Sequence, residues 1–224
     1  YDLILAACLK AGNYARKHNI RLTSHPGPFN KLASPKERVF QLTATDLKVH
    51  ADLFDMIGLR RSPYAKLNIH VGAAYNDKPF ALDNFCRNFE RLPESVQSRL
   101  TVENDDKPSL YSTKELYDGV YKRIGIPIVF DYHHHMLHPG GQTEQEALEL
   151  ALSTWPAHVT PVVHYAESRS IEHNNPKIKP QAHSDYVNGP INDYGHRIDV
   201  MIEAKHKELA LLKYRNTVML PASV

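Results

Sequence analysis

Six apolar stretches of this chain each end in a histidine or a carboxylate, and this repetition limits the possible folds more than any other feature. Each stretch has the length and composition of a buried strand, and sequence with helical periodicity separates it from the next. Alternating strands and helices with short connections predict an α/β protein with a parallel sheet. Because parallel strands end at one edge of their sheet, the six terminal side chains are expected to meet there. The predicted strands are residues 20–25, 66–70, 100–103, 126–131, 159–164 and 198–203.

Capping signals mark three of the predicted helices. Ser34, Ser112 and Thr143 each stand three residues before a glutamate, which is the capping-box pattern. Gly58 and Gly125 follow helical segments and predict their C-terminal ends. The helices are expected over residues 2–17, 34–57, 81–91, 94–99, 112–125, 143–153 and 205–215, with a long polar loop over 166–196.

The architecture that we predict is a TIM-type (β/α)8 barrel, a single domain over residues 1–224 that lacks its first two strands. Six strands are visible and the chain starts inside a predicted helix, so a closed eight-stranded barrel would need two earlier strands. An open doubly wound sheet is the alternative. The chain has neither a Gly-x-Gly-x-x-Gly motif nor a Gly-Lys-Ser/Thr loop, which weakens that alternative and predicts no nucleotide cofactor.

Alternation along the strands predicts a polar lumen. Counting back from each terminal side chain defines one face of a strand, because successive side chains point to opposite faces. The other face is almost wholly apolar and suits packing against helices. Polar groups buried in a lumen are costly unless they pair or bind a metal ion, so the polar face predicts a metal site. By this count the face contains no lysine, and its members are Arg21, Thr23, His25, Asn68, His70, Thr101, Glu103, Thr160, Val162, His164, Asp199, Met201 and Glu203.

Carboxylates at strand ends are the strongest single candidates for metal ligands. Glu103 and Glu203 each end a predicted strand, and an ion pair with Arg21 is the structural alternative for Glu103. Asp131 ends another strand, and the His133–His135 triplet comes shortly after it, a combination that suits a divalent ion. The residues themselves do not choose among the three histidines of the triplet.

Several polar or aromatic residues outside the strands are weaker candidates. Asp105 and Asp106 follow Glu103 and are interpreted as a solvated charge run. His183 lies in the long polar loop and belongs to no predicted strand end, and an exposed histidine is the usual case there. Phe29 follows a Pro-Gly turn, so we expect it either to stand exposed over the barrel mouth or to fold back onto its rim.

Composition narrows the classes of function. With 42% hydrophobic and 23% charged residues the chain is an ordinary globular sequence, and no apolar stretch is long enough to cross a bilayer. Cys8 and Cys86 lie far apart and no Gly-x-Ser-x-Gly elbow occurs, so hydrolysis by a serine or cysteine nucleophile has little support. Two isolated thiols predict an intracellular protein, in the cytoplasm of a prokaryote or the nucleus of a eukaryote. The net charge of +2 permits a nucleic-acid partner without requiring one.

Seven short motifs occur in an order that resembles the UV damage endonuclease family. They are Ser24–Gly27, Asn68–Gly72, Glu103–Asp105, Asp131–His134, His164, His183–Tyr186 and Glu203–Lys207. The resemblance covers about residues 20–210. It implies a (β/α)8 barrel similar to endonuclease IV and the sugar isomerases, with a cluster of up to three metal ions. It also implies an enzyme that nicks DNA on the 5′ side of pyrimidine dimers and other lesions.

The resemblance also implies the residues of the site. It selects His134 from the triplet and adds His183, and Glu103, Asp131 and Glu203 would be catalytic. The cofactors would be two or three divalent ions, Mn²⁺ by preference with Zn²⁺ or Mg²⁺ as alternatives, and the partner would be damaged double-stranded DNA bound by a monomer. The implied metal ligands are His25, His70, Glu103, Asp131, His134, His164, His183 and Glu203. The resemblance places Pro28 and Phe29 at the DNA. Four lysines are expected either to meet DNA phosphates or to be solvated surface charges, namely Lys177, Lys179, Lys205 and Lys207.

Two positions depart from the family pattern. Pro28 and Phe29 stand where the family carries a glutamine–tyrosine pair that probes the damaged site, and Phe29 can still stack on a base. Val162 stands where relatives carry a lysine two residues before the strand-end histidine. The alternatives to a UV endonuclease are an abasic-site endonuclease of the endonuclease IV type, a sugar isomerase, and a barrel that binds DNA without catalysis. A sugar isomerase would need a lysine in the lumen.

Overall fold

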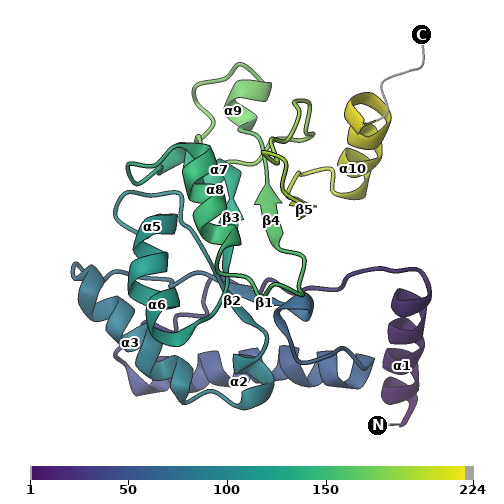
Figure 1. Cartoon of the computed structure of the whole chain (residues 1–224), viewed down its shortest axis with the longest axis vertical. Coiled ribbons are helices and arrows are strands. Elements are labelled where there is room, and N and C mark those ends of the chain that lie inside the picture. The colour runs from purple at the N-terminus through teal and green to yellow at the C-terminus, as the bar shows by residue number, and fades with distance from the viewer. Residues whose placement is uncertain (1, 220–224) are drawn as a thin grey trace.

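A curled, parallel five-stranded sheet forms the centre of the protein in a computed structural model that describes residues 2–219 (Figure 1). Its strands are β1 (Leu67–Ile69), β2 (Leu100–Glu103), β3 (Ile128–Asp131), β4 (Val162–Tyr165) and β5 (Asp199–Ile202). They pair in sequence order, each parallel to its neighbours. The predicted α/β class with a parallel sheet is therefore confirmed, and the sheet has the form of half a barrel.

Helices cover the outer face of this half-barrel, as alternation of strands and helices requires. The helices of residues 2–219 are α1 (Asp2–Lys17), α2 (Glu37–Ile57), α3 (Lys78–Glu90), α4 (Glu94–Gln97), α5 (Thr113–Leu116), α6 (Lys122–Ile124), α7 (Tyr132–Leu137), α8 (Glu144–Leu152), α9 (Arg169–Glu172) and α10 (Glu208–Tyr214), with short 3-10 or π segments η1 (Pro63–Ala65), η2 (Tyr117–Tyr121) and η3 (Arg215–Met219). Helix α2 packs on β1, α5 on β2 and α8 on β3, whereas α1 stands beside α2, away from the sheet (Figure 1). No helix among residues 2–219 is long and apolar enough to cross a membrane.

Local sequence signals fix most helix ends. The capping boxes at Ser112 and Thr143 form as predicted, with hydroxyl and glutamate side chains each bonded to the other residue's backbone N–H. Gly58 and Gly125 end α2 and α6 with φ of 78° and 70°. Only glycine adopts this left-handed conformation without steric cost, so both predicted helix ends are confirmed.

The capping box predicted at Ser34 does not form. The Ser34 hydroxyl accepts a hydrogen bond from Lys36 N at 3.2 Å, and α2 begins at Glu37 without a side-chain cap. Ser34 N donates to Lys31 O at 3.0 Å, and Ser34 O accepts from the Asn88 amide at 3.2 Å. These bonds commit Ser34 to the turn before the helix, so the predicted helix start is too early.

The first predicted strand, residues 20–25, forms only a single bridge, from Ser24 to Leu67 of β1. Two backbone hydrogen bonds of 2.9 Å accompany this bridge. Earlier in the segment, Arg21 is held by its side chain, which donates to main-chain oxygens of neighbouring segments. In the register of this bridge, residues 20–22 lie opposite the 3-10 segment η1 (Pro63–Ala65) rather than an extended strand, so the ladder does not continue and the segment is extended but is not a strand. The prediction of a sixth strand is wrong, although the segment still delivers His25 to the sheet edge.

Three further boundaries differ from the prediction. Strand β4 begins at Val162 rather than at 159, because Pro161 has no N–H for a ladder bond. The polar loop over 166–196 contains the short helix α9. Helix α10 begins later than predicted because Lys207, with φ of 48°, interrupts the backbone before it.

Two apolar clusters support the site. The main core packs the predicted apolar strand faces against the helices, and its members include Leu47, Phe54, Leu67, Ile69, Phe85, Leu100, Val102, Leu116, Leu148 and Val163. The second cluster lies inside the sheet below the strand ends and consists of Val129, Trp155, Val159 and Val162, which we term the lower plug. The plug closes the lower part of the lumen and leaves the polar side chains at the carboxyl ends of the strands.

Candidate metal centre

Glu103, the last residue of β2, lies at the centre of the predicted site. Its side chain is 1% exposed. Its Oε2 atom is 3.3 Å from His25 Nε2 and 3.0 Å from His164 Nδ1. Its Oε1 atom is 3.2 Å from His134 Nδ1 and 3.8 Å from His70 Nε2. Four histidines from different segments therefore surround one buried carboxylate.

Strand register explains why these side chains meet. The β1–β2 pairing places His70 beside Glu103, and the β3–β4 pairing sets Asp131 opposite His164. Glu203 follows β5 directly, and its backbone N–H bonds to the end of β4 at 2.8 Å. The strand-end side chains thus meet at one edge of the sheet, as predicted.

Charge and burial oppose each other in this cluster. Burial alone would raise the pKa of Glu103, but the charges of His164 and His70 hold it well below its ordinary value. Asp131 is also fully buried, and burial raises its pKa to about 6. Glu203 lies further out, with Oε1 3.0 Å from His164 Nδ1. The carboxylates thus keep different proton affinities within one small site.

The residues present fit divalent metal ions. Among the described residues, two buried carboxylate oxygens have no hydrogen-bond donor, Glu103 Oε1 and Asp131 Oδ2. An oxygen left without a donor in the interior is costly, and a cation would satisfy it. Imidazole nitrogen and carboxylate oxygen are ligands that Mn²⁺ and Zn²⁺ accept. Three groups place one ligand atom per residue within 4.8 Å of one another: His25–His70–Glu103, His25–His164–Glu203 and Glu103–Asp131–His134.

The histidine triplet lies on a helix, where its three rings point in different directions. The Asp131 carboxylate caps α7 by accepting from His134 N at 2.7 Å, and the His134 ring faces Glu103. His133 is buried with its ring centroid 5.5 Å from that of His183. His135 packs against the ring of Phe130 instead. Helical geometry therefore sets His134 apart, as the family resemblance did. His183, in the loop after α9, lies with its Nδ1 3.7 Å from Glu203 Oε2.

Lys66 is a lumen residue that the sequence analysis missed. Its side chain is 1% exposed, and Nζ lies 2.9 Å from His164 Nε2. Burial lowers its pKa to about 8. One further step back from Asn68 along the same strand face would have found it. The expectation of a lumen without lysine is wrong. Lysine content therefore does not distinguish this lumen from that of a sugar isomerase.

Three other residues near the site were misjudged or overlooked. Asp105 was interpreted as solvated, but it is 5% exposed and its Oδ1 lies 3.1 Å from His70 Nδ1. The buried Asn104 side chain donates to Asp131 O at 3.0 Å and accepts from Asp131 N at 2.8 Å, which fixes the end of β3. The buried Asn68 amide donates to Glu103 Oε2. Short polar side chains on lumen-facing positions or next to strand ends were the available signal.

Arg21 does not pair with Glu103. Its guanidinium instead contacts Asp199 at 2.8 Å, near the lower plug. The structural alternative proposed for Glu103 is therefore wrong. This result leaves the histidines and Lys66, rather than Arg21, as the positive groups at the site.

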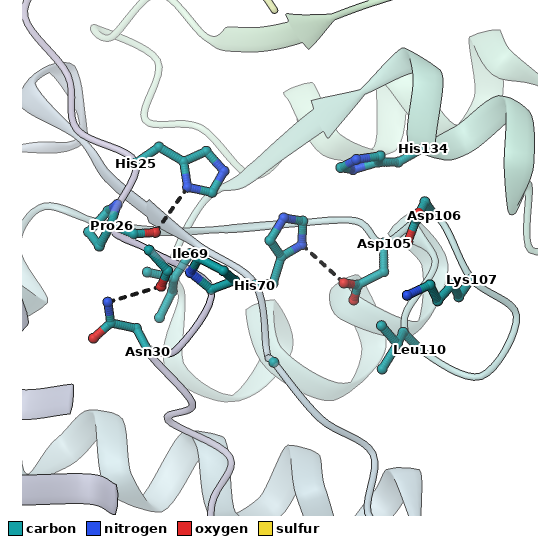
Figure 2. A pocket seen from close by; sticks show the side chains of 13 residues that line it. His25, Pro26, Asn30, Ile69, His70, Asp105, Asp106, Lys107, Leu110 and His134 are labelled. Atoms are coloured by element: carbon teal, nitrogen blue, oxygen red, sulfur yellow. Dashed lines mark hydrogen bonds and ion pairs between the residues drawn. The ribbon is translucent and has the colours of Figure 1, made fainter. Parts of the chain in front are cut away.

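A cavity of about 380 Å³ opens beside the histidine cluster (Figure 2). Its lining combines His25, His70 and His134 with the turn after residue 25 and the loop after β2. Pro28 lines this cavity, and Phe29 is 67% exposed with its ring lying over Gly27. Of the two alternatives for Phe29, the structure thus shows an exposed aromatic ring. Lys177, Lys179 and Lys205 are exposed and do not line the cavity.

Fold and site together define a class of protein, a parallel α/β half-barrel with a carboxylate–imidazole cluster at the carboxyl ends of its strands. The chain matches the family model for UV-endonuclease UvdE over residues 2–220. It is 34% identical over 213 residues to the UV DNA damage endonuclease of Bacillus cereus (strain G9842), covering 91% of this chain and 64% of that protein. The corresponding protein of Bacillus thuringiensis subsp. konkukian (strain 97-27) is 34% identical over 214 residues, covering 92% and 64%. The chain belongs to the UvdE family, as its motif order predicted, and spans about 64% of the length of these curated relatives.

Solved structures agree with this assignment. The crystal structure of SacUVDE superposes with a TM-score of 0.84 at 31% sequence identity, covering 97% of this chain and 72% of that one. A D-tagatose 3-epimerase-like protein superposes with a TM-score of 0.64 at 16% identity, covering 96% and 85%. The second likeness shows a shared fold alone. Sequence identity to the UV endonucleases distinguishes this chain from the sugar epimerases, whereas the residue types in its lumen do not.

Proposed function

We propose that this chain carries the active site of a DNA repair endonuclease, which hydrolyses a phosphodiester bond 5′ to UV photoproducts with divalent metal ions. The observation that carries the proposal is Glu103, a buried carboxylate with nitrogens of four histidines within 3.8 Å. The names of the curated relatives support UV-damaged DNA as the substrate. We also propose that β1–β5, the extended residues 20–25 and two further strands together fill the eight positions of a (β/α)8 barrel. The two further strands would lie between β5 and residues 20–25, since neither edge has an outer partner among the described residues.

We propose that the cluster holds two or three ions, Mn²⁺ by preference. When bound, such ions stabilise charge on the phosphoryl oxygens and lower the pKa of water towards about 7. Glu103 would bridge two of them, and Asp131 and Glu203 would supply the remaining catalytic carboxylates. The proposed ligand groups are His25, His70 and Glu103 for one ion, Glu103, Asp131, His164 and Glu203 for a second, and His134 with His183 for a third. The ligand atoms of the first group lie within 4.8 Å of one another, and the ring centroids of His134 and His183 are 6.4 Å apart.

The histidines must lose protons before they can hold an ion. Burial lowers the pKa of His70, but the charges of Glu103 and Asp105 raise it to about 9. Burial is likewise outweighed at His134, where Asp131 and Glu103 raise the pKa to about 10. Metal binding therefore competes with protons at these rings and releases them. In the metal-free protein the same protons neutralise the buried carboxylates.

The substrate would approach over the cavity beside the histidines. Phe29 is exposed at its rim, where an aromatic ring can stack on a base or fill a gap in the duplex. Pro28 lines the cavity and would contact the same region. We propose that Lys177, Lys179 and Lys205, which are exposed, meet DNA phosphates.

A nicking assay with defined lesions tests this proposal. The intact protein would be incubated with duplexes that contain one cyclobutane dimer, one abasic site or no lesion, with Mn²⁺ or with EDTA. We expect incision directly 5′ to the dimer, in Mn²⁺ only. Preference for the abasic duplex would favour the abasic-site alternative, and equal nicking of undamaged DNA would contradict both.

A further inference from the structure

Asp105 lies where the carboxyl ends of β1 and β2 meet. The pairing of these strands sets His70 beside Glu103, and Asp105 follows two residues beyond Glu103. Its Oδ1 atom is 3.1 Å from His70 Nδ1 (Figure 2), whereas the other ring nitrogen, His70 Nε2, is 3.8 Å from Glu103 Oε1. One imidazole therefore stands between two buried carboxylates, with a different nitrogen turned to each.

The loop after β2 holds Asp105 in this place. Asp105 N donates to Tyr111 O at 2.8 Å, and Asp105 Oδ2 accepts from Tyr111 N at 3.3 Å. The buried Tyr111 hydroxyl then donates to Ala73 O at 3.1 Å, in the segment that follows His70. These bonds tie the Asp105 loop to the chain that carries His70. They leave Oδ1 of Asp105 directed at the imidazole.

We propose that Asp105 is the positioning residue of His70, which fixes the ring so that Nδ1–H faces Asp105 and Nε2 faces Glu103. This inference rests on the proposed metal-dependent function, in which His70 Nε2 would serve as the ligand atom. A carboxylate on the far nitrogen of a ligand histidine selects its tautomer, orients its ring and strengthens it as a donor. Asp105 also lines the cavity beside the histidines, and its Oδ1 faces the His70 ring rather than Glu103.

Loop closure alone is the competing explanation for Asp105. That role is carried by its backbone N–H and by Oδ2, both bonded to Tyr111. A loop-closing role leaves Oδ1, which is buried against His70, without a function. A loop-closing role predicts that substitution lowers stability and leaves the metal affinity of the folded protein unchanged. A positioning role predicts that the metal affinity itself falls.

Titration with Mn²⁺ alone separates the two roles. The intact protein and the variants Asp105→Ala, Asp105→Asn and Asp106→Asn would be titrated by calorimetry and by electron paramagnetic resonance. Thermal unfolding of each metal-free sample would show which variants are folded. We expect Asp105→Ala to weaken one Mn²⁺ site by about 10–100-fold, the range typical of such outer partners. Asp105→Asn, which keeps an acceptor oxygen, should lose less, and Asp106→Asn, a half-buried neighbour without a histidine partner among the described contacts, should match the parent.

A second readout covers the case in which Asp105→Ala fails to fold. Long-range ¹H–¹⁵N spectra of the Zn²⁺-loaded parent should show His70 protonated at Nδ1, and Asp105→Asn should weaken or shift that signal. Parent-like Mn²⁺ affinity in a folded Asp105 variant, or a His70 ring protonated at Nε2, would overturn the inference. If the parent binds Mn²⁺ but does not nick damaged DNA, the proposed function fails while the Asp105 inference stands.

Discussion

The two ends of the sheet interior differ in how their charged side chains are paired. At the lower end, Arg21 Nη1 donates to Asp199 at 2.8 Å and to Thr160 O at 2.7 Å, Nε donates to Tyr64 O at 2.7 Å, and Nη2 donates to Pro63 O at 3.1 Å. Each nitrogen of this guanidinium is used, and the lower plug packs beside it. Partners within the chain satisfy the whole Arg21 guanidinium, so this end needs no ligand.

At the upper end, by contrast, partners within the described chain do not satisfy every buried polar atom. Glu103 and Asp131 each keep one buried oxygen without a donor, and the surrounding imidazoles crowd around them. The same strands therefore build a satisfied charge at one end and an unsatisfied cluster at the other. A buried polar group without a partner usually marks function rather than stability. The difference predicts that substitutions above the plug alter activity and metal affinity, and that substitutions beside it alter folding.

The largest effect should come from Glu103→Gln. This change removes the charge that four histidines share and the proposed bridge between two ions, so nicking of dimer-containing DNA should fall at least about 100-fold, or about 2.7 kcal/mol in activation free energy. Glu90→Gln, on the exposed end of α3, is the matched control. Nicking rates for a folded variant, judged by circular dichroism, make the measurement. Parent-like nicking by Glu103→Gln would show that the cluster is not catalytic.

Metal removal should produce the next largest effect. Added Mn²⁺ at about 100 times its dissociation constant would stabilise the folded state by about 2.7 kcal/mol. In a domain of this size that corresponds to a rise in Tm of about 5–10 °C. Calorimetry of EDTA-treated protein before and after Mn²⁺ addition tests it, with Ca²⁺ as the ionic-strength control. An unchanged Tm would mean that the unsatisfied oxygens have another partner.

Arg21→Met should act on stability alone. The loss of the guanidinium leaves carbonyl oxygens of Tyr64 and Thr160 without their donor, which should cost about 1–3 kcal/mol of unfolding free energy. Urea denaturation of this variant beside Arg38→Met, an exposed arginine of α2, measures the difference. Nicking at a temperature where both variants are folded should match the parent. A selective loss of activity in Arg21→Met would break the contrast between the two ends.

Much of this contrast was visible in the sequence, because strand alternation is local. Counting back from Glu103 or His164 predicted which side chains share the interior, and the structure brings them together. The count stopped too early at Asn68, and so it missed Lys66. The ligand types in the site could therefore be predicted without knowing how the strands curl.

Partners between separate segments could not be predicted in this way. Nothing near Arg21 in the sequence indicates that Asp199 lies beside it, and the charge run after Glu103 gives no sign that Asp105 turns back to His70. Such pairings depend on strand register and loop closure, which are set by packing over the whole sheet. The same reason explains why residues 20–25 resemble a strand but form one bridge, since a ladder needs neighbours as well as propensity.

The smallest expected effect is a pH dependence that only the upper end should show. In the metal-free protein the pKa values of His70 and His134 are raised to about 9 and about 10, above the value of about 6.5 for an unfolded histidine. A raised folded pKa contributes stability that is fully present below about pH 6.5 and is lost as pH rises through 9 and 10. The metal-free Tm should therefore fall across this window, and His134→Gln should flatten the fall.

Mn²⁺ should reverse the direction of this dependence. The ion competes with the same protons, so the rise in Tm that it produces should grow as pH increases from about 6.5 to about 9. Arg21 carries its charge throughout this range, so the cost of Arg21→Met should be the same at every pH. Thermal unfolding of parent, His134→Gln and Arg21→Met at several pH values, with and without Mn²⁺, tests all three statements. A Mn²⁺ effect that does not change with pH would mean that the ion does not displace the histidine protons. An Arg21→Met cost that varies with pH would mean that the two ends are electrostatically coupled through the lumen rather than separated by the lower plug.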